Sequence, residues 1–193
     1  DIGCGDGRFL REVRSRYPDK TLLGIDASER AVRLAQALNP DLAYRALDIV
    51  REGLAQTYDA ATLIEVIEHI PPLDLPAFLD AVAQAINPGG LLVLTVPHRN
   101  KSVIEKHYQH FSGEQLRNLL APRFDVQKIL PFDPAPRTPI AWLTLRMLGG
   151  KGRWFLFTQQ RILYRCYQRY LRHYLYADDE SRCERIAVIC TRR

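Results

Sequence analysis

Apolar residues recur along this chain with the two periods that distinguish strands from helices. Short apolar runs predict strands, and apolar positions at helical spacing predict the helices between them. The predicted strands are Thr21–Asp26, Leu42–Leu47, one within Tyr58–His69 (a range that includes the loop after the strand), Leu91–Val96, Phe124–Leu130 and Arg185–Cys190. Helices are predicted near residues 8–17, 28–38, 74–86 and 112–120. Alternation of strands and helices indicates an α/β fold.

The ends of these predicted helices carry the expected capping residues. Ser28 can cap the second helix, and Asn39-Pro40 ends it. Ser112 and Gln115 fit a capping box at the start of the fourth helix.

The chain opens with a glycine-rich turn, Asp1-Ile2-Gly3-Cys4-Gly5-Asp6-Gly7, directly before the first predicted helix. Three glycines this close allow a tight turn and let a ligand lie against bare main chain. The dinucleotide-binding fingerprint would need a glycine where Arg8 stands, and no P-loop motif is present. The turn therefore predicts a nucleotide-like ligand without either of those phosphate-binding motifs.

The heptad resembles the first motif of class I methyltransferases that depend on S-adenosylmethionine (SAM). Further family features follow in order: an acid after the second strand, an acid after the third, and the Asn87–Gly90 turn before the fifth. The resemblance implies a Rossmann-like fold with a seven-stranded, mostly parallel sheet. Its last strand would be antiparallel and lie between strands five and six.

The same resemblance implies a set of residues that bind SAM. Asp1 and the loop carbonyls suit the ammonium group, Asp26 the ribose hydroxyls, and Asp48 the adenine amino group. The complete expected set is Asp1, Gly3, Cys4, Gly5, Gly7, Asp26, Ala27, Asp48, Ile49 and Glu65.

Transfer of a methyl group to oxygen usually needs a base, and histidine suits that task because its pKa is near neutrality. The candidates are His69, His107 and His110, with His98 as a further possibility after the fifth strand. The alternative for His69 is a wall of the cofactor pocket. The alternative for His107 is an ordinary surface histidine.

Glu65, Glu68 and His69 have E-x-x-E-H spacing, and His107 and His110 add H-x-x-H. This pattern resembles the ubiquinone-biosynthesis O-methyltransferases. It also resembles the small-RNA 3′-terminal 2′-O-methyltransferases, which coordinate a metal through such residues. The aromatic-rich segment that follows in the RNA enzymes is absent, because residues 111–114 read Phe-Ser-Gly-Glu. We therefore expect no essential metal and keep RNA 2′-O-methylation as the alternative function.

The chain is predicted to be a single domain over residues 1–193, with a helical insertion at 131–184 between strands six and seven. The insertion contains two predicted helices, 139–148 and 153–176. The overall net charge is +5, yet no acid lies between Asp133 and Asp178, where eight lysine and arginine residues occur. Such asymmetry points to a partner surface rather than to the fold.

The 153–176 helix is amphipathic, with Arg161, Arg165, Arg169 and Arg172 on one side and tyrosines on the other. We expect the arginine side to face an anionic membrane surface or a lipid-linked acceptor. An ordinary solvated face and contact with RNA are the alternatives, and nucleic acid is the less favoured partner.

The chain begins inside a motif, which predicts that a first strand and a helix over the cofactor are missing. The cysteines lack C-x-x-C spacing, so reduced cytoplasmic thiols are expected, and no apolar run is long enough to span a membrane. We therefore predict a cytoplasmic enzyme, peripheral to a membrane if the basic helix binds one. Its predicted activity is SAM-dependent O-methylation of a small-molecule, glycan or lipid-linked acceptor. A non-catalytic protein with the same fold is a third possibility.

Overall fold

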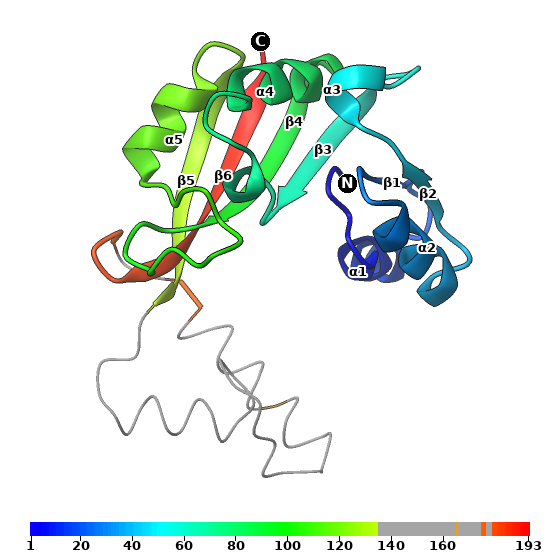
Figure 1. Ribbon diagram of the computed structural model, residues 1–193, viewed down its shortest axis with the longest axis horizontal. Helices are drawn as coiled ribbons and strands as arrows, with labels where there is room; N and C mark the ends of the chain where they lie inside the picture. Colours follow the sequence, from blue (N-terminus) through cyan, green and yellow to red (C-terminus); the bar gives the residue numbers. More distant parts are fainter. Residues whose placement is uncertain (135–164, 166–174, 177–178) are drawn as a thin grey trace.

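A computed structural model describes residues 1–134, 165, 175–176 and 179–193, in which strands and helices alternate as predicted (Figure 1). The strands in this part are β1 (Leu23–Asp26), β2 (Ala43–Ala46), β3 (Tyr58–Ile64), β4 (Ile86–Pro97), β5 (Phe124–Pro134) and β6 (Cys183–Arg192). The helices there are α1 (Arg8–Arg16), α2 (Glu29–Leu38), α3 (Ile49–Glu52), α4 (Leu75–Gln84) and α5 (Gly113–Leu120), with a 3₁₀ turn, η1 (Ile67–His69).

The strands form a parallel pair, β1-β2, and a four-stranded sheet in the order β3-β4-β6-β5. Strand β3 runs parallel to β4, whereas β6 is antiparallel to both β4 and β5. The prediction that the last strand lies antiparallel between two earlier ones is therefore confirmed.

The first two residues join these two groups of strands. The Ile2 N–H donates to the Thr62 carbonyl at 2.9 Å, and the Ile25 N–H donates to the Asp1 carbonyl at 2.8 Å. Asp1 and Ile2 thus lie between β1 and β3, where the family would place its first strand. The expected total of seven strands stays a prediction.

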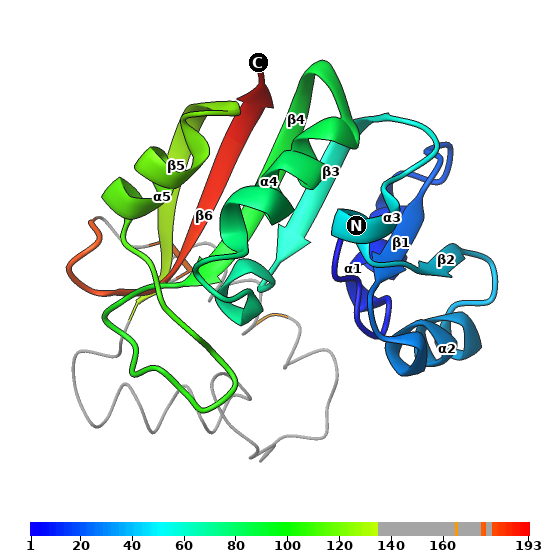
Figure 2. The ribbon, with the colours of Figure 1, turned by 45° about the horizontal axis from the view of Figure 1, so that its top comes forward.

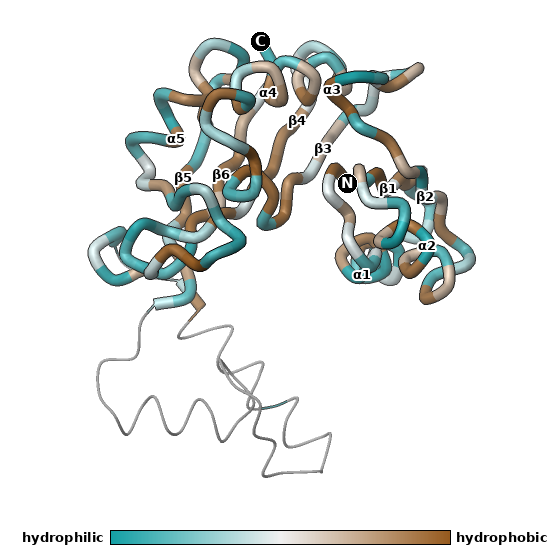
Figure 3. The backbone as a smooth tube through the Cα atoms, viewed as in Figure 1, coloured by the Kyte–Doolittle hydropathy of each residue, from teal (hydrophilic) through white to brown (hydrophobic). Residues whose placement is uncertain are grey.

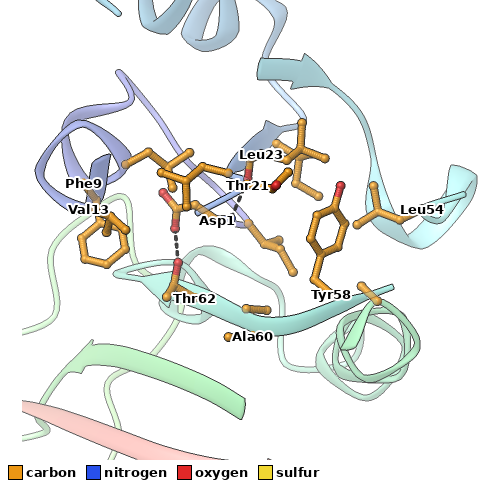
Figure 4. Close-up of a pocket in the computed structure, with 15 residues that line it drawn as sticks. Asp1, Phe9, Val13, Thr21, Leu23, Leu54, Tyr58, Ala60 and Thr62 are labelled. Carbon is orange, nitrogen blue, oxygen red and sulfur yellow. Dashed lines mark hydrogen bonds between the residues drawn. The ribbon is translucent and has the colours of Figure 1, made fainter. Parts of the chain in front are cut away.

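Beside these residues lies a mainly apolar pocket between β1 and β3 (Figure 4). Its wall includes Phe9 and Val13 of α1, Leu23 of β1, Tyr58 of β3, and Leu54. None of the three loop glycines lines this pocket.

Helices α4 and α5 cover one face of the four-stranded sheet (Figure 2). The larger core forms there, around side chains such as Leu63, Leu79, Leu94 and Ile186. A smaller core joins α1, α2 and β2 around Leu10, Ala35 and Tyr44. The central strand β4 is largely apolar (Figure 3).

Two helix starts follow the predicted capping chemistry. The Ser28 side chain accepts from the Ala31 N–H, and Ser112 and Gln115 form the reciprocal capping box at α5. Helix α3 was not predicted. It is a single turn whose first amides, at Val50 and Arg51, donate to the Asp48 carboxylate.

Strand β4 starts earlier than predicted. Asn87–Gly90 does not precede the strand as a turn but forms an irregularity inside it, since Tyr58 pairs with Ile86 and Ala60 with Leu91. Asn87 holds this bulge by donating its side-chain amide to Asp59.

The predicted insertion boundaries, 131 and 184, are wrong at both ends. Residues 131–134 continue β5, and Cys183 and Glu184 already belong to β6. Prolines at 131 and 134 are tolerated because β5 is an edge strand, which does not need every N–H in the ladder. The predicted 139–148 helix, and the 153–176 helix apart from residues 165, 175 and 176, lie outside the described residues.

Among the described residues, no helix has the length and apolar character needed to cross a membrane.

Candidate functional site

The glycine turn leads from Asp1 and Ile2 into α1, and it is hydrogen-bonded to β1, which follows α1 in the chain. The N–H groups of Gly3 and Cys4 both donate to the Ile25 carbonyl, at 2.8 and 2.9 Å. Gly7 has a φ of 75° and stands immediately before α1. A Cβ at Gly7 would collide with the Tyr44 hydroxyl oxygen, so the turn needs glycine there for both conformation and space.

Gly5 is different, because its open side faces no protein atom. Its φ is +54°, and a Cβ built on it would meet nothing within 4 Å. Bare main chain beside open space is the surface that a nucleotide-like ligand needs, so the turn fits the expected cofactor.

Asp26, at the end of β1, holds the glycine turn directly. Its Oδ2 accepts from the Gly5 N–H at 3.0 Å, and its Oδ1 accepts from the Ser28 N–H at 2.9 Å. Each carboxylate oxygen has a second lone pair, which leaves capacity for ribose hydroxyls. The structure therefore gives Asp26 a role in shaping the loop that the sequence did not reveal.

Replacing Asp26 with alanine is expected to weaken binding of S-adenosylhomocysteine by about 1.5–3 kcal/mol, or roughly ten- to 150-fold. Both the ribose contact and the loop amides lose their acceptor. Titration calorimetry on Asp26→Ala and the isosteric Asp26→Asn measures this, because Asn keeps one oxygen for an amide. Unchanged affinity of the alanine variant would remove Asp26 from the site.

The other predicted cofactor residues near this loop are partly structural. Cys4 is buried in the smaller core. The pKa of its thiol is raised to about 11, mainly by burial and next by the negative charge of nearby Asp26. Ile49 belongs to the larger core. Asp48 caps α3 while remaining half-exposed, and Ala27 is exposed. Contacts of Cys4 and Ile49 with a ligand would therefore use their backbone.

The Asp1 carboxylate is engaged by β3. Its Oδ1 accepts from the Thr62 hydroxyl at 2.6 Å, on the wall of the apolar pocket (Figure 4). The expected contact between this carboxylate and the ammonium of SAM stays a prediction.

Glu65 follows β3 and adopts a left-handed backbone conformation, with φ 57°. Such a conformation is costly for a residue other than glycine and is often found at functional sites. Its Oε2 lies 3.4 Å from Nε of Arg185 on β6. The next residue, Val66, packs against Gly3, where an added Cβ would lie 2.7 Å from a Val66 methyl group. The glycine turn and the end of β3 therefore meet.

Glu68 is fully buried, and neither of its carboxylate oxygens has a hydrogen-bond partner. The pKa of Glu68 is raised to about 7, chiefly by burial; its own backbone N–H, Arg185 and Lys101 lower the pKa, and Glu65 adds to the increase. A buried carboxyl without a partner is expensive to ionise, so Glu68 is a candidate to hold a proton near neutral pH.

The three predicted catalytic histidines lie together. The ring centroids of His69 and His107 are 4.7 Å apart, and those of His107 and His110 are 5.0 Å apart. His69 is exposed at the end of η1, His107 is half-buried, and His110 is buried.

Hydrogen bonds to carbonyl groups fix the tautomers of these rings. His69 Nδ1–H donates to the Lys106 carbonyl at 2.9 Å, and His110 Nδ1–H donates to the Lys101 carbonyl at 2.8 Å. Neutral His110 then accepts at Nε2 from His107 Nδ1–H, at 2.8 Å. Nε2 of neutral His107 is left with a bare lone pair. Burial, together with His69, His110 and Lys101, lowers the pKa of His107 and favours this neutral form.

Glu68, His69 and His107 place one ligand atom each within 4.8 Å of one another, close enough to share a divalent cation. The other two residues of the sequence pattern have different partners: Glu65 faces Arg185, and Nε2 of His110 is hydrogen-bonded to His107. An activity assay in chelator decides whether the enzyme needs a metal.

His98, the remaining candidate base, lies apart from the histidine cluster. It is only 2% exposed, its Nδ1 accepts from the Asn100 N–H, and burial lowers its pKa. Sequence reasoning missed its neighbour Glu180, and it missed Arg185. Neither stands in a recognisable motif, and each reaches its partner from a distant part of the chain.

Residues 1–127 match a family model described as a methyltransferase domain. The chain belongs to this family. The predicted class, a SAM-dependent methyltransferase domain with a Rossmann-like fold, is thereby confirmed.

Curated relatives include ubiquinone-biosynthesis O-methyltransferases. The human mitochondrial protein is 33% identical over 110 residues, which cover 52% of this chain and 29% of the relative. The Leptothrix cholodnii protein is 35% identical over 109 residues, covering 52% and 44%. A carboxy-S-adenosyl-L-methionine synthase from Actinobacillus succinogenes is 31% identical over 121 residues, covering 56% and 50%. The chain thus spans half or less of the length of these relatives.

Solved structures agree with the fold. A SAM-dependent methyltransferase from Archaeoglobus fulgidus superposes with a TM-score of 0.64 at 17% identity, covering 99% of this chain and 84% of that one. The N-methyltransferase NodS from Bradyrhizobium japonicum, in complex with S-adenosyl-L-homocysteine, gives 0.62 at 16% identity, covering 100% and 75%. At these identities the likeness concerns the fold alone.

Proposed function

We propose that this protein transfers the methyl group of SAM to a hydroxyl oxygen of a small-molecule, glycan or lipid-linked acceptor. Among these, a phenolic hydroxyl is favoured, because ubiquinone-biosynthesis O-methyltransferases are among its relatives. The observation that carries the proposal is the bare Nε2 of His107, held in a cluster with His69, which lies three residues after the Val66 that contacts Gly3 of the glycine turn.

The glycine turn and Asp26 would hold the cofactor. The open side of Gly5 gives the ligand access to main chain, and the second lone pairs of Asp26 suit the ribose. When bound, SAM supplies a methyl group on a positively charged sulfur, which makes the carbon reactive. The protein therefore has to position the acceptor and remove its proton.

His107 is placed to take that proton. A hydroxyl that loses its proton to Nε2 becomes a better nucleophile, and His107 becomes an imidazolium. His110 stabilises this cation by accepting from Nδ1–H, and the Lys101 carbonyl holds His110 in the required tautomer. A nitrogen acceptor would have less need of such a base, which is why oxygen is favoured.

Two alternatives remain as outcomes of the test. RNA 2′-O-methylation receives no support from the relatives and structures described above. A non-catalytic domain would bind the cofactor and transfer nothing.

We expect the protein to move a labelled methyl group from SAM to the oxygen of a catechol that carries a short isoprenoid chain. The rate should be unchanged by a chelator, because the sulfonium supplies the reactivity without a metal. His107→Gln should lower the rate by about 10²–10⁴ while S-adenosylhomocysteine still binds. Mass spectrometry of the product and calorimetry of the variant give both readouts.

Binding without transfer to any hydroxyl would leave the non-catalytic alternative. Loss of activity in chelator, restored by magnesium or manganese, would make Glu68, His69 and His107 metal ligands instead.

A further inference from the structure

Glu180 joins three segments that are far apart in the sequence. Its Oε2 accepts from the Gly113 N–H, at the first residue of α5, at 2.9 Å. The same oxygen lies 3.4 Å from Nε2 of His98, directly after β4. Its backbone carbonyl accepts from the Asn100 side chain at 2.6 Å and from the Cys183 thiol at 3.4 Å. One residue thus contacts the end of β4, the start of α5 and the start of β6.

The contact with Gly113 is closely fitted. A Cβ at Gly113 would collide with Oε1 of Glu180, so any larger residue would displace the carboxylate. A negative charge at the N-terminus of α5 also interacts favourably with the helix dipole. Both observations indicate a built contact rather than a chance approach of a surface side chain.

His98 is held in one tautomer at the same junction. The Asn100 N–H donates to its Nδ1 at 3.1 Å, so the neutral ring carries its proton on Nε2, facing Glu180. Burial lowers the pKa of His98, Glu180 opposes this effect, and Arg99 adds to it. The neutral ring is therefore favoured, and its Nε2 faces the carboxylate at 3.4 Å without making a regular hydrogen bond.

Residues 98–112, here called the histidine loop, carry His107 and His110 between these anchors. At its base the Arg99 N–H donates to the Phe111 carbonyl, and the Phe111 N–H donates to the Pro97 carbonyl. The His98 N–H donates to the Glu184 carbonyl. The Lys101 carbonyl, which fixes the tautomer of His110, lies only three residues beyond His98. A shift at the junction is therefore transmitted to the histidines.

We propose that Glu180 is a positioning residue for the methyl-transfer site. By holding His98 and the start of α5 together, it fixes the histidine loop and keeps Nε2 of His107 bare. Its catalytic consequence rests on the proposed function, whereas its effect on the histidine rings does not.

Glu180→Ala and Glu180→Gln test this, with Glu105→Gln as the control because Glu105 is an exposed residue of the same loop. Long-range ¹H–¹⁵N spectra report the tautomer and pKa of each imidazole. The alanine variant should shift the His107 and His110 signals and populate the other tautomer. The glutamine variant should shift them less, since its amide oxygen can still accept from Gly113. The control should leave them unchanged.

In transfer assays, kcat of Glu180→Ala should fall about tenfold, a fraction of what a general base contributes, with the affinity for S-adenosylhomocysteine unchanged. Gly113→Ala displaces the carboxylate without altering charge and should reproduce the spectral shift, which keeps the test usable if Glu180→Ala does not fold. Histidine spectra identical to wild type in folded Glu180→Ala, or in Gly113→Ala, would overturn the proposal. A spectral shift in a protein that transfers no methyl group would refute the proposed function and still support the positioning role.

Discussion

Replacing Gly5 with valine is expected to abolish binding of S-adenosylhomocysteine, with a loss of at least roughly 100-fold, or about 3 kcal/mol. No protein atom lies within 4 Å of the position a Cβ would take, so the fold can accommodate the side chain. The branched side chain would then occupy the space that the ligand needs. Calorimetry measures the affinity, and circular dichroism checks that the variant is folded.

The left-handed conformation of Gly5 adds strain of its own, which needs a separate control. Gly89, in the bulge of β4, has a similar φ of +76°, and a Cβ added there would also meet open space. Gly89→Val should therefore cost comparable stability while binding normally. Binding of the ligand by Gly5→Val at near wild-type affinity would mean that Gly5 does not face it.

Replacing Glu68 with glutamine is expected to change how stability depends on pH. The pKa of Glu68 is raised from 4.5 to about 7, so the folded state keeps a proton that the unfolded state has released. Wild-type stability should therefore fall as pH rises from about 4.5 to 7, by about 3 kcal/mol from this group. Glutamine resembles the neutral carboxyl, so this loss should disappear in the variant.

Urea unfolding of wild type and Glu68→Gln at pH 4 and pH 8, in chelator, measures the effect. The variant should match wild type at the lower pH and exceed it at the higher. Glu12→Gln, which changes an exposed glutamate on α1, should show no such pH-dependent difference in stability from wild type. Parallel curves for wild type and Glu68→Gln would show that Glu68 ionises as an ordinary surface acid.

Features carried by local sequence were predicted well. The glycine turn, the Ser28 and Ser112 caps and the antiparallel last strand follow from spacing, capping chemistry and resemblance. His69, His107 and His110 were each predicted as candidate catalytic bases. Their cluster depends on residues 69 and 107–110 meeting across the sheet edge, which sequence spacing alone cannot specify.

The sequence could not predict that residues of the same type would have different partners and burial within that site. The E-x-x-E-H pattern treats its two glutamates alike, yet Glu65 faces Arg185 and Glu68 is buried without a partner. The positive φ at Glu65 separates them, and no residue type signals it. The C-terminal end of β5 was missed for a related reason, because β6, the strand that pairs with residues 131–134, lies about fifty residues away in the sequence.

The two hydrogen bonds of Asp26 bear on the thermodynamics of cofactor binding. Because the backbone amides of Gly5 and Ser28 already donate to its carboxylate, the glycine turn is ordered before any ligand binds. A ligand that enters a preformed site loses little free energy to the ordering of the loop. The association rate should then be limited by diffusional encounter rather than by rearrangement of the loop. SAM and S-adenosylhomocysteine should bind to the same rigid surface. Discrimination between them falls to the sulfur end of the ligand, where their charges differ.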